Sequence, residues 1–194
     1  MKRIILLILF FYPGFNTINS QLISETKQPN SFSLSGSVIY IDNADYALVK
    51  KSAELLQQDI ELVTGQRLSI IHDLNTVKGN IIIVGTIEKS SLIQKLIQQK
   101  KISTATIKNK WEAYQMQAIS NPIKGISNAL VITGSDRRGT AYGVFELSKQ
   151  IGVSPWYWWA DVPVKKKATI YIKKGAQRKA LTRSEVLRQD ALFS

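Results

Sequence analysis

Two short apolar runs, each ending at a glycine, constrain the fold of this 194-residue chain more than any other feature. The first covers residues 80–84 before Gly85, and the second covers residues 129–133 before Gly134. Runs of this length without polar alternation are typical of strands that are covered on both faces of a sheet. Apolar residues at helical spacing follow each run, over residues 90–99 and from Asp136 to about Ile151. We therefore expect buried strands with helices packed against them.

Other segments continue this alternation of strands and helices. Residues 44–63 have apolar residues at helical spacing, with Asp42 or Asn43 placed to cap the helix and Gly65 placed to end it. Gly125 marks a turn. Further strands are expected over residues 33–41 with a turn or bulge at Gly36, over 67–71, over 113–119 as a half-buried strand, and over 168–172. This pattern predicts an α/β fold, a mixed β-sheet with packed helices.

The first twenty residues have the features of an export signal. Lys2 and Arg3 precede an apolar run over residues 4–12, and Ser20 offers a small residue at a cleavage point before Gln21. The run is shorter than the roughly 20 apolar residues that span a bilayer. We expect residues 1–20 to be a signal peptide, 21–30 a linker, 31–174 one α/β domain and 175–194 a basic, poorly ordered tail. The mature protein would be secreted or periplasmic, without a membrane anchor.

The net charge of +12 is unevenly distributed along the chain. Residues 165–194 hold nine lysines and arginines but only two acidic residues, whereas residues 4–164 are nearly neutral. A solvated tail explains such a charge run, and polyanion binding is the alternative. We expect no nucleic-acid partner.

Few residues are suited to autonomous catalysis. The sequence contains no cysteine, and His72 is its single histidine, so thiolate and histidine-cluster metal sites are excluded. Glycoside hydrolysis requires two carboxyl groups that face each other across the scissile bond. Asp136 and Asp161 are the only carboxylates beside unusual loops, and Asp161 precedes a turn. We expect no catalytic residue, metal or cofactor in this chain.

The loop over residues 134–143 combines glycines with two arginines. Ser135 or Asp136 is placed to cap the following helix, and Arg137 and Arg138 lie in its first turn. Positive charge is unfavourable there, because the helix dipole is positive at its amino end. Two explanations remain open: the arginines bind a carboxylate ligand, or they pair with carboxylates of the protein.

Four consecutive aromatic residues follow this helix: Trp156, Tyr157, Trp158 and Trp159. Such rings can stack on sugars, pack between domains or fill a core. Together with the loop at Asp136 and Arg137, this segment makes residues 131–164 resemble the N-terminal region of glycoside hydrolase family 115. More loosely, the chain from about residue 31 resembles the N-terminal α/β domain of other α-glucuronidases and of β-hexosaminidases.

The resemblance implies a modular, secreted xylan α-1,2-glucuronidase that removes glucuronic acid or its 4-O-methyl ether from xylan with inversion. It implies catalytic carboxylates in a (β/α)8 barrel that follows this domain, so the present chain would be a noncatalytic fragment truncated before its partner barrel. The intact enzyme would bind a glucuronoxylan-type polysaccharide. The implied contributors to the rim of its site are Arg137, Arg138, Trp156, Trp158 and Trp159.

Two other functions compete with this interpretation. The aromatic segment from Trp156 to Trp159 would serve as the platform of a free carbohydrate-binding module, and if extended it would place Trp156 and Trp158 on one side. The basic tail would serve polyanion binding, which weakens steeply with salt.

Overall fold

The computed structural model describes residues 22–154 and 163–180. The expected signal peptide over residues 1–20 lies outside the described residues, as do Trp156, Trp158 and Trp159. Within the described ranges, no helix combines the length and the apolar character that crossing a lipid bilayer requires.

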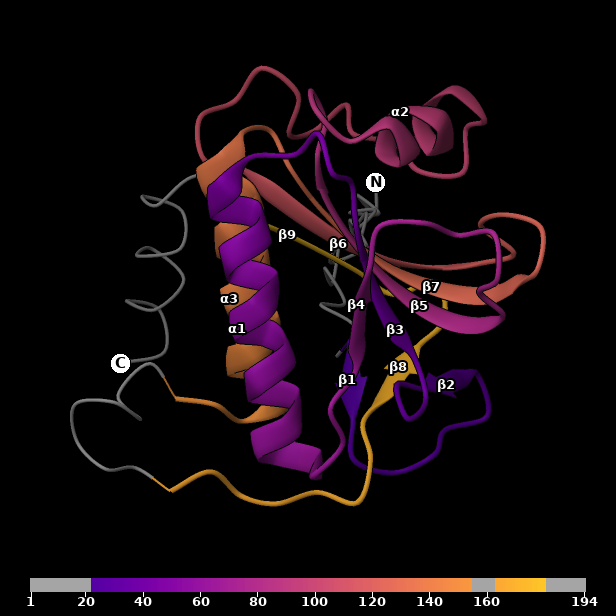
Figure 1. Ribbon diagram of the computed structural model, residues 1–194, viewed down its shortest axis with the longest axis vertical. Helices are drawn as coiled ribbons and strands as arrows, with labels where there is room; N and C mark the ends of the chain where they lie inside the picture. Colours follow the sequence, from indigo (N-terminus) through magenta and orange to yellow (C-terminus); the bar gives the residue numbers. More distant parts are fainter. Residues whose placement is uncertain (1–21, 155–162, 181–194) are drawn as a thin grey trace, which may run out of the picture.

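A six-stranded mixed sheet forms the centre of the domain (Figure 1), as the apolar runs predict. Its strands follow the order β4-β3-β5-β7-β6-β9. The first four are parallel, while β6 is antiparallel to both of its neighbours, β7 and β9. The bounds are β3 (Val38–Ile41), β4 (Ser69–Ile71), β5 (Gly79–Thr86), β6 (Tyr114–Ser120), β7 (Ile126–Gly134) and β9 (Gln177–Ala180).

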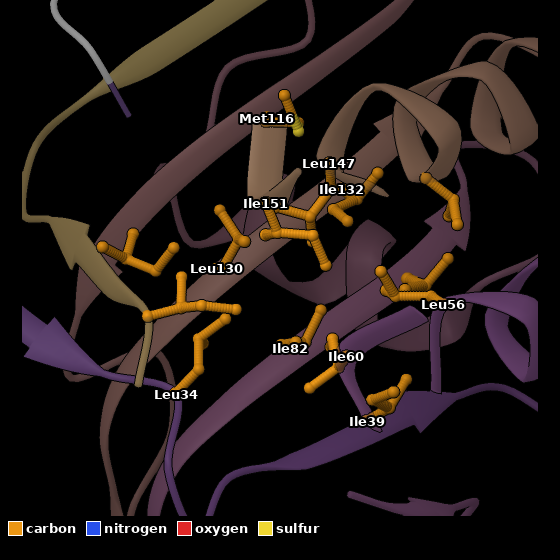
Figure 2. Packing of buried hydrophobic residues seen from close by; sticks show 14 of the residues in the cluster. Leu34, Ile39, Leu56, Ile60, Ile82, Met116, Leu130, Ile132, Leu147 and Ile151 are labelled. Atoms are coloured by element: carbon orange, nitrogen blue, oxygen red, sulfur yellow. The ribbon is translucent and has the colours of Figure 1, made fainter. Parts of the chain in front are cut away.

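Helices cover both faces of this sheet. The helices α1 (Ala47–Thr64) and α3 (Arg137–Ile151) lie side by side on one face, and α2 (Ser91–Gln98) packs on the other. Side chains of β5 alternate between the faces. Ile82 packs toward α1 and α3 (Figure 2). Ile83 belongs to the cluster on the opposite face, which includes Leu92 of α2. Each such side chain contributes about 1.5–3 kcal/mol when fully buried. The continuous apolar runs are explained by this burial on both faces.

A smaller, second sheet is present that the sequence patterns did not predict. It contains β1 (Ile23–Ser24), β8 (Tyr171–Lys173) and β2 (Ser31–Ser33), in that order. Leu22 and Ile23 are buried in the core, so residues 21–30 are not simply a linker. The strand expected over 33–41 is two strands in different sheets, because Gly36 adopts a left-handed turn with φ of 70° between them.

The expectation of a basic tail from residue 175 is wrong for residues 175–180. Ala176 is buried, and β9 pairs with β6, so that β6 becomes an interior strand and Gln115 is buried rather than half exposed. Arg178 of β9 forms an ion pair with Glu146 of α3, at 2.7 Å. A hydrophilic sequence enters the sheet here because its backbone groups complete the edge of β6.

Part of the preceding lysine run also has a structural role. The Lys166 ammonium donates to the Leu62 carbonyl at 2.6 Å, and the Lys167 amide donates to the Val63 carbonyl at 2.8 Å. Carbonyls of the last helical turn have no partner within the helix, and a cation there complements the dipole. These lysines therefore stabilise the end of α1, where Gly65 ends the helix as expected.

The start of α1 differs from the prediction. Tyr46 occupies the N-cap position, and its side chain makes no capping hydrogen bond. Asp42 instead accepts hydrogen bonds from the amide and the hydroxyl of Ser91, at the start of α2. Its carboxylate joins two loops rather than capping the helix that follows it.

Candidate functional site

The loops that follow the parallel strands meet at one edge of the large sheet. At this edge β3, β5 and β7 end and α1, α2 and α3 begin. The antiparallel strand β6 begins there too, because Tyr114 pairs with Gly134. Open α/β sheets usually bind ligands at such an edge, which makes these loops the candidate site.

Asp136 holds two of the loops together. It caps α3, accepting the Gly139 amide on Oδ1 at 2.7 Å, and it also accepts the Glu112 amide on Oδ2 at 2.7 Å. Next to it, the Ser135 hydroxyl accepts the Ala113 amide at 3.0 Å. The two polar residues of the loop therefore bind the chain segment that enters β6.

The glycines of the same loop allow backbones to approach closely. A Cβ atom on Gly139 would lie 2.3 Å from the Ala113 carbonyl oxygen, and one on Gly134 would lie 2.1 Å from the Thr140 nitrogen. Both distances are shorter than van der Waals contact permits. The glycine spacing is thus explained by packing of α3 against β7 and the segment before β6.

Arg138 forms an ion pair with Glu112 at 2.8 Å. Its guanidinium lies 3.5 Å from the Tyr142 hydroxyl, and Tyr142 and Glu112 both raise the pKa of Arg138. Of the two explanations that the sequence left open, pairing within the protein therefore applies to Arg138. Its side chain remains 53% exposed, so one side of the guanidinium faces solvent.

Arg137 is exposed beside a polar cluster formed by the other two loops. The Tyr46 hydroxyl donates to Glu88 at 3.0 Å, and the Lys89 ammonium lies 5.6 Å from the centre of the Tyr46 ring. Glu88 raises the pKa of Tyr46, while the positive charge of Arg137 opposes that shift. Within the described ranges, Arg137 makes no ion pair closer than 4.0 Å.

A further aromatic residue, Trp111, stands at this edge and was not singled out by the sequence patterns. Its side chain is 74% exposed, immediately before Glu112. A tryptophan between Lys110 and Glu112, in a polar stretch, was the available signal.

A groove of about 830 Å³ lies elsewhere, on the outer side of the two long helices. Its lining includes Leu62 and Asp59 of α1 and Phe145 of α3. Burial raises the pKa of Asp59. The Ser148 hydroxyl acts in the opposite direction on this pKa, and burial has the larger effect. Among the described residues no three His, Cys, Asp or Glu side chains are grouped as a metal site requires.

Comparison with solved structures relates this fold to glycoside hydrolases. A family GH115 4-O-methyl-α-glucuronidase with specificity for decorated arabinogalactans matches 81% of this chain at 32% identity, with a TM-score of 0.61. A GH20 β-N-acetylhexosaminidase from Streptomyces coelicolor matches 80% of this chain and 24% of its own length, at 14% identity and a TM-score of 0.46. The first match supports the expected resemblance to family 115.

The match covers only part of that enzyme. This chain spans 18% of the length of the GH115 glucuronidase. No family model matches the chain, and no curated protein sequence matches it. The likeness therefore concerns a region the size of one α/β domain.

Proposed function

We propose that this chain acts as a noncatalytic α/β domain of a GH115-like glycoside hydrolase. The observation that carries the proposal is the match at 32% identity over 81% of this chain but only 18% of a 4-O-methyl-α-glucuronidase. A segment of that size supports the role of one domain within a larger enzyme. The complete enzyme would act on polysaccharides that bear 4-O-methylglucuronic acid side chains, such as glucuronoxylan.

The carboxylates at the edge of the sheet support the noncatalytic role. Asp136 accepts two backbone amides, Glu112 pairs with Arg138, and Asp45 accepts hydrogen bonds from Thr86. A general acid and a general base must each be free to exchange a proton with substrate or water. Carboxylates that are committed to structural hydrogen bonds are poorly suited to that task.

Purified protein tests the noncatalytic role directly. Incubation with 4-O-methylglucuronoxylan and with glucuronic-acid-decorated arabinogalactan is expected to release no 4-O-methylglucuronic acid, measured by anion-exchange chromatography. A family GH115 glucuronidase serves as the positive control. Release in proportion to the concentration of this protein would overturn the proposal.

A chimaera tests the relation to family GH115. The matched segment of the 4-O-methyl-α-glucuronidase would be replaced by residues 22–180 of this chain, and by an unrelated α/β domain as a control. We expect the first chimaera to keep measurable turnover and the control to lose it. Equal inactivity of both, in folded proteins, contradicts the proposed equivalence.

Secretion is part of the same proposal. The charge and the apolar run of residues 1–20 support an export signal. Expression with the native N-terminus in a bacterial host should deliver protein to the periplasm or medium, with an N-terminus near Gln21 by Edman sequencing. Protein retained in the cytoplasm with Met1 or Lys2 at its N-terminus would contradict export.

A further inference from the structure

Trp111 is the most exposed large hydrophobic residue among those that the structure describes, and it is held on an ordered segment. Ile107, four residues earlier, is fully buried. The Lys110 amide donates to the Ile107 carbonyl at 3.1 Å, and the Glu112 amide donates to Asp136 at 2.7 Å. The indole is therefore presented from a fixed backbone rather than from a free loop tip.

The backbone on both sides of Trp111 is strained. Asn109 and Glu112 have φ values of 62° and 53°, in the left-handed region that residues other than glycine rarely adopt. Each such residue costs on the order of 1 kcal/mol and persists only where its surroundings enforce it. The hydrogen bond from Glu112 to Asp136 and the adjoining contact between Ala113 and Ser135 provide that enforcement. Strain of this kind often accompanies binding sites.

Exposed cationic residues neighbour Trp111 in the chain and across the adjoining loop. Lys108 and Lys110 are exposed in the same segment, and Arg138 reaches Glu112 from the start of α3, next to the exposed Arg137. Lysine is depleted in the cores of protein interfaces, whereas an indole offers a flat apolar face for a sugar ring. The cations complement a carboxylate. This combination favours an acidic glycan over a protein partner.

We propose that Trp111, with the cations around it, binds a uronic-acid-bearing polysaccharide at the edge of the sheet. The indole stacks on a pyranose ring, and Lys108, Lys110 and the exposed side of Arg138 attract its carboxylate. The proposal deepens the proposed function, because it places a glycan-binding surface on the noncatalytic domain. It differs from the site expected at Trp156, Trp158 and Trp159, which lie outside the described residues.

Affinity electrophoresis of the full chain tests this surface. The probes are 4-O-methylglucuronoxylan and the same polymer with its carboxylates reduced to alcohols. The wild type is expected to be retarded by the acidic polymer and less by the reduced one. Trp111→Ala should weaken binding about tenfold, the loss typical of an anchoring tryptophan. Trp111→Phe should retain part of the affinity.

One control variant and one further test variant accompany Trp111→Ala. Phe145→Ala removes another exposed aromatic side chain, 43% exposed and in the groove of α1 and α3, and should leave retardation unchanged. Lys108→Ala with Lys110→Ala should weaken binding to the acidic polymer at low salt, with a smaller effect at high salt. Circular dichroism verifies that every variant is folded.

Several outcomes overturn the proposal. They are absence of retardation of the wild type, equal retardation of Trp111→Ala and the wild type, and equal binding to the acidic and reduced polymers. Association of the wild type with a GH115 catalytic region that Trp111→Ala abolishes, without glycan binding, would assign the surface to a protein partner instead. None of these results affects the turnover assay or the chimaera, so the two proposals fail separately.

Discussion

The carboxylate of Asp136 accepts the backbone amide of Glu112 at 2.7 Å, across 24 residues of sequence. The same carboxylate caps α3 through Gly139. One side chain thus fixes the start of a helix and the segment that carries Trp111 into β6. We expect Asp136→Ala to lower the free energy of unfolding by roughly 2–3 kcal/mol, from the lost cap and one unpaired amide.

Urea denaturation followed by circular dichroism measures this loss. Asp136→Asn should cost less, because its amide oxygen can still accept one of the two backbone amides. An alanine variant as stable as the wild type would show that the clamp contributes nothing to the fold.

Gly139→Ala separates two opposing effects. Alanine is favoured over glycine inside a helix by about 1 kcal/mol. At this position, however, a Cβ atom would lie 2.3 Å from the Ala113 carbonyl oxygen, and backbone atoms cannot rotate away. We expect the clash to win, with a lower melting temperature and a net loss of roughly 2 kcal/mol or more.

Gly143→Ala, one turn later, is the matched control for that variant. Its nearest neighbours would be side-chain atoms of Ile132 and Tyr114, at 2.9 and 3.2 Å, which can move more easily. Differential scanning calorimetry should find Gly139→Ala clearly less stable than Gly143→Ala. The reverse order would contradict the steric explanation of the loop glycines.

The sequence was informative where apolar side chains decide whether an element is buried. The runs at 80–84 and 129–133 correctly indicated interior strands, and helical spacing with Gly65 located α1. The pattern of apolar residues could not locate β9. Residues 177–180 enter the sheet through backbone pairing with β6 rather than through apolar side chains.

The site was predictable only in part, for a related reason. The sequence located the loop at Asp136 and the helix it caps, but not the partners of its side chains. Glu112 is 26 residues from Arg138, and only the hairpin of β6 and β7 brings them together. No sequence pattern distinguishes Trp111 from a buried tryptophan, because exposure is a property of the folded chain.

Asp45, just before α1, binds Thr86 at the end of β5. We expect it to contribute as much to the stability of the fold as Asp136. It is 5% exposed and accepts both the amide and the hydroxyl of Thr86 at 2.8 Å, together with the Tyr46 amide. Asp45→Ala leaves buried donors without acceptors and should cost roughly 3 kcal/mol. Thr86→Val removes only the hydroxyl and should cost about 1 kcal/mol. Urea titrations that rank the two variants equally would contradict this network.

The raised pKa of Asp59 predicts a specific dependence of stability on pH. Burial raises its pKa above the ordinary value of 3.8, so the folded state holds this proton more tightly than the unfolded state. Stability therefore falls as pH rises from 3.8 through the raised pKa, and the penalty is fully present at neutral pH. Asp59→Asn removes the charge and should stabilise the protein at pH 7 by a few tenths of a kcal/mol, since the group is partly solvated.

Chemical denaturation of both proteins between pH 3 and pH 7 measures this effect, and the advantage of Asp59→Asn should grow with pH over that range. Glu54→Gln, on the exposed side of the same helix and paired only with Lys51, is the control and should show no comparable trend. A difference between Asp59→Asn and the wild type that stays constant with pH would show that the Asp59 carboxylate is ionised without penalty in the folded protein. Its position in the groove beside Phe145 and Leu62 would then be of no electrostatic consequence.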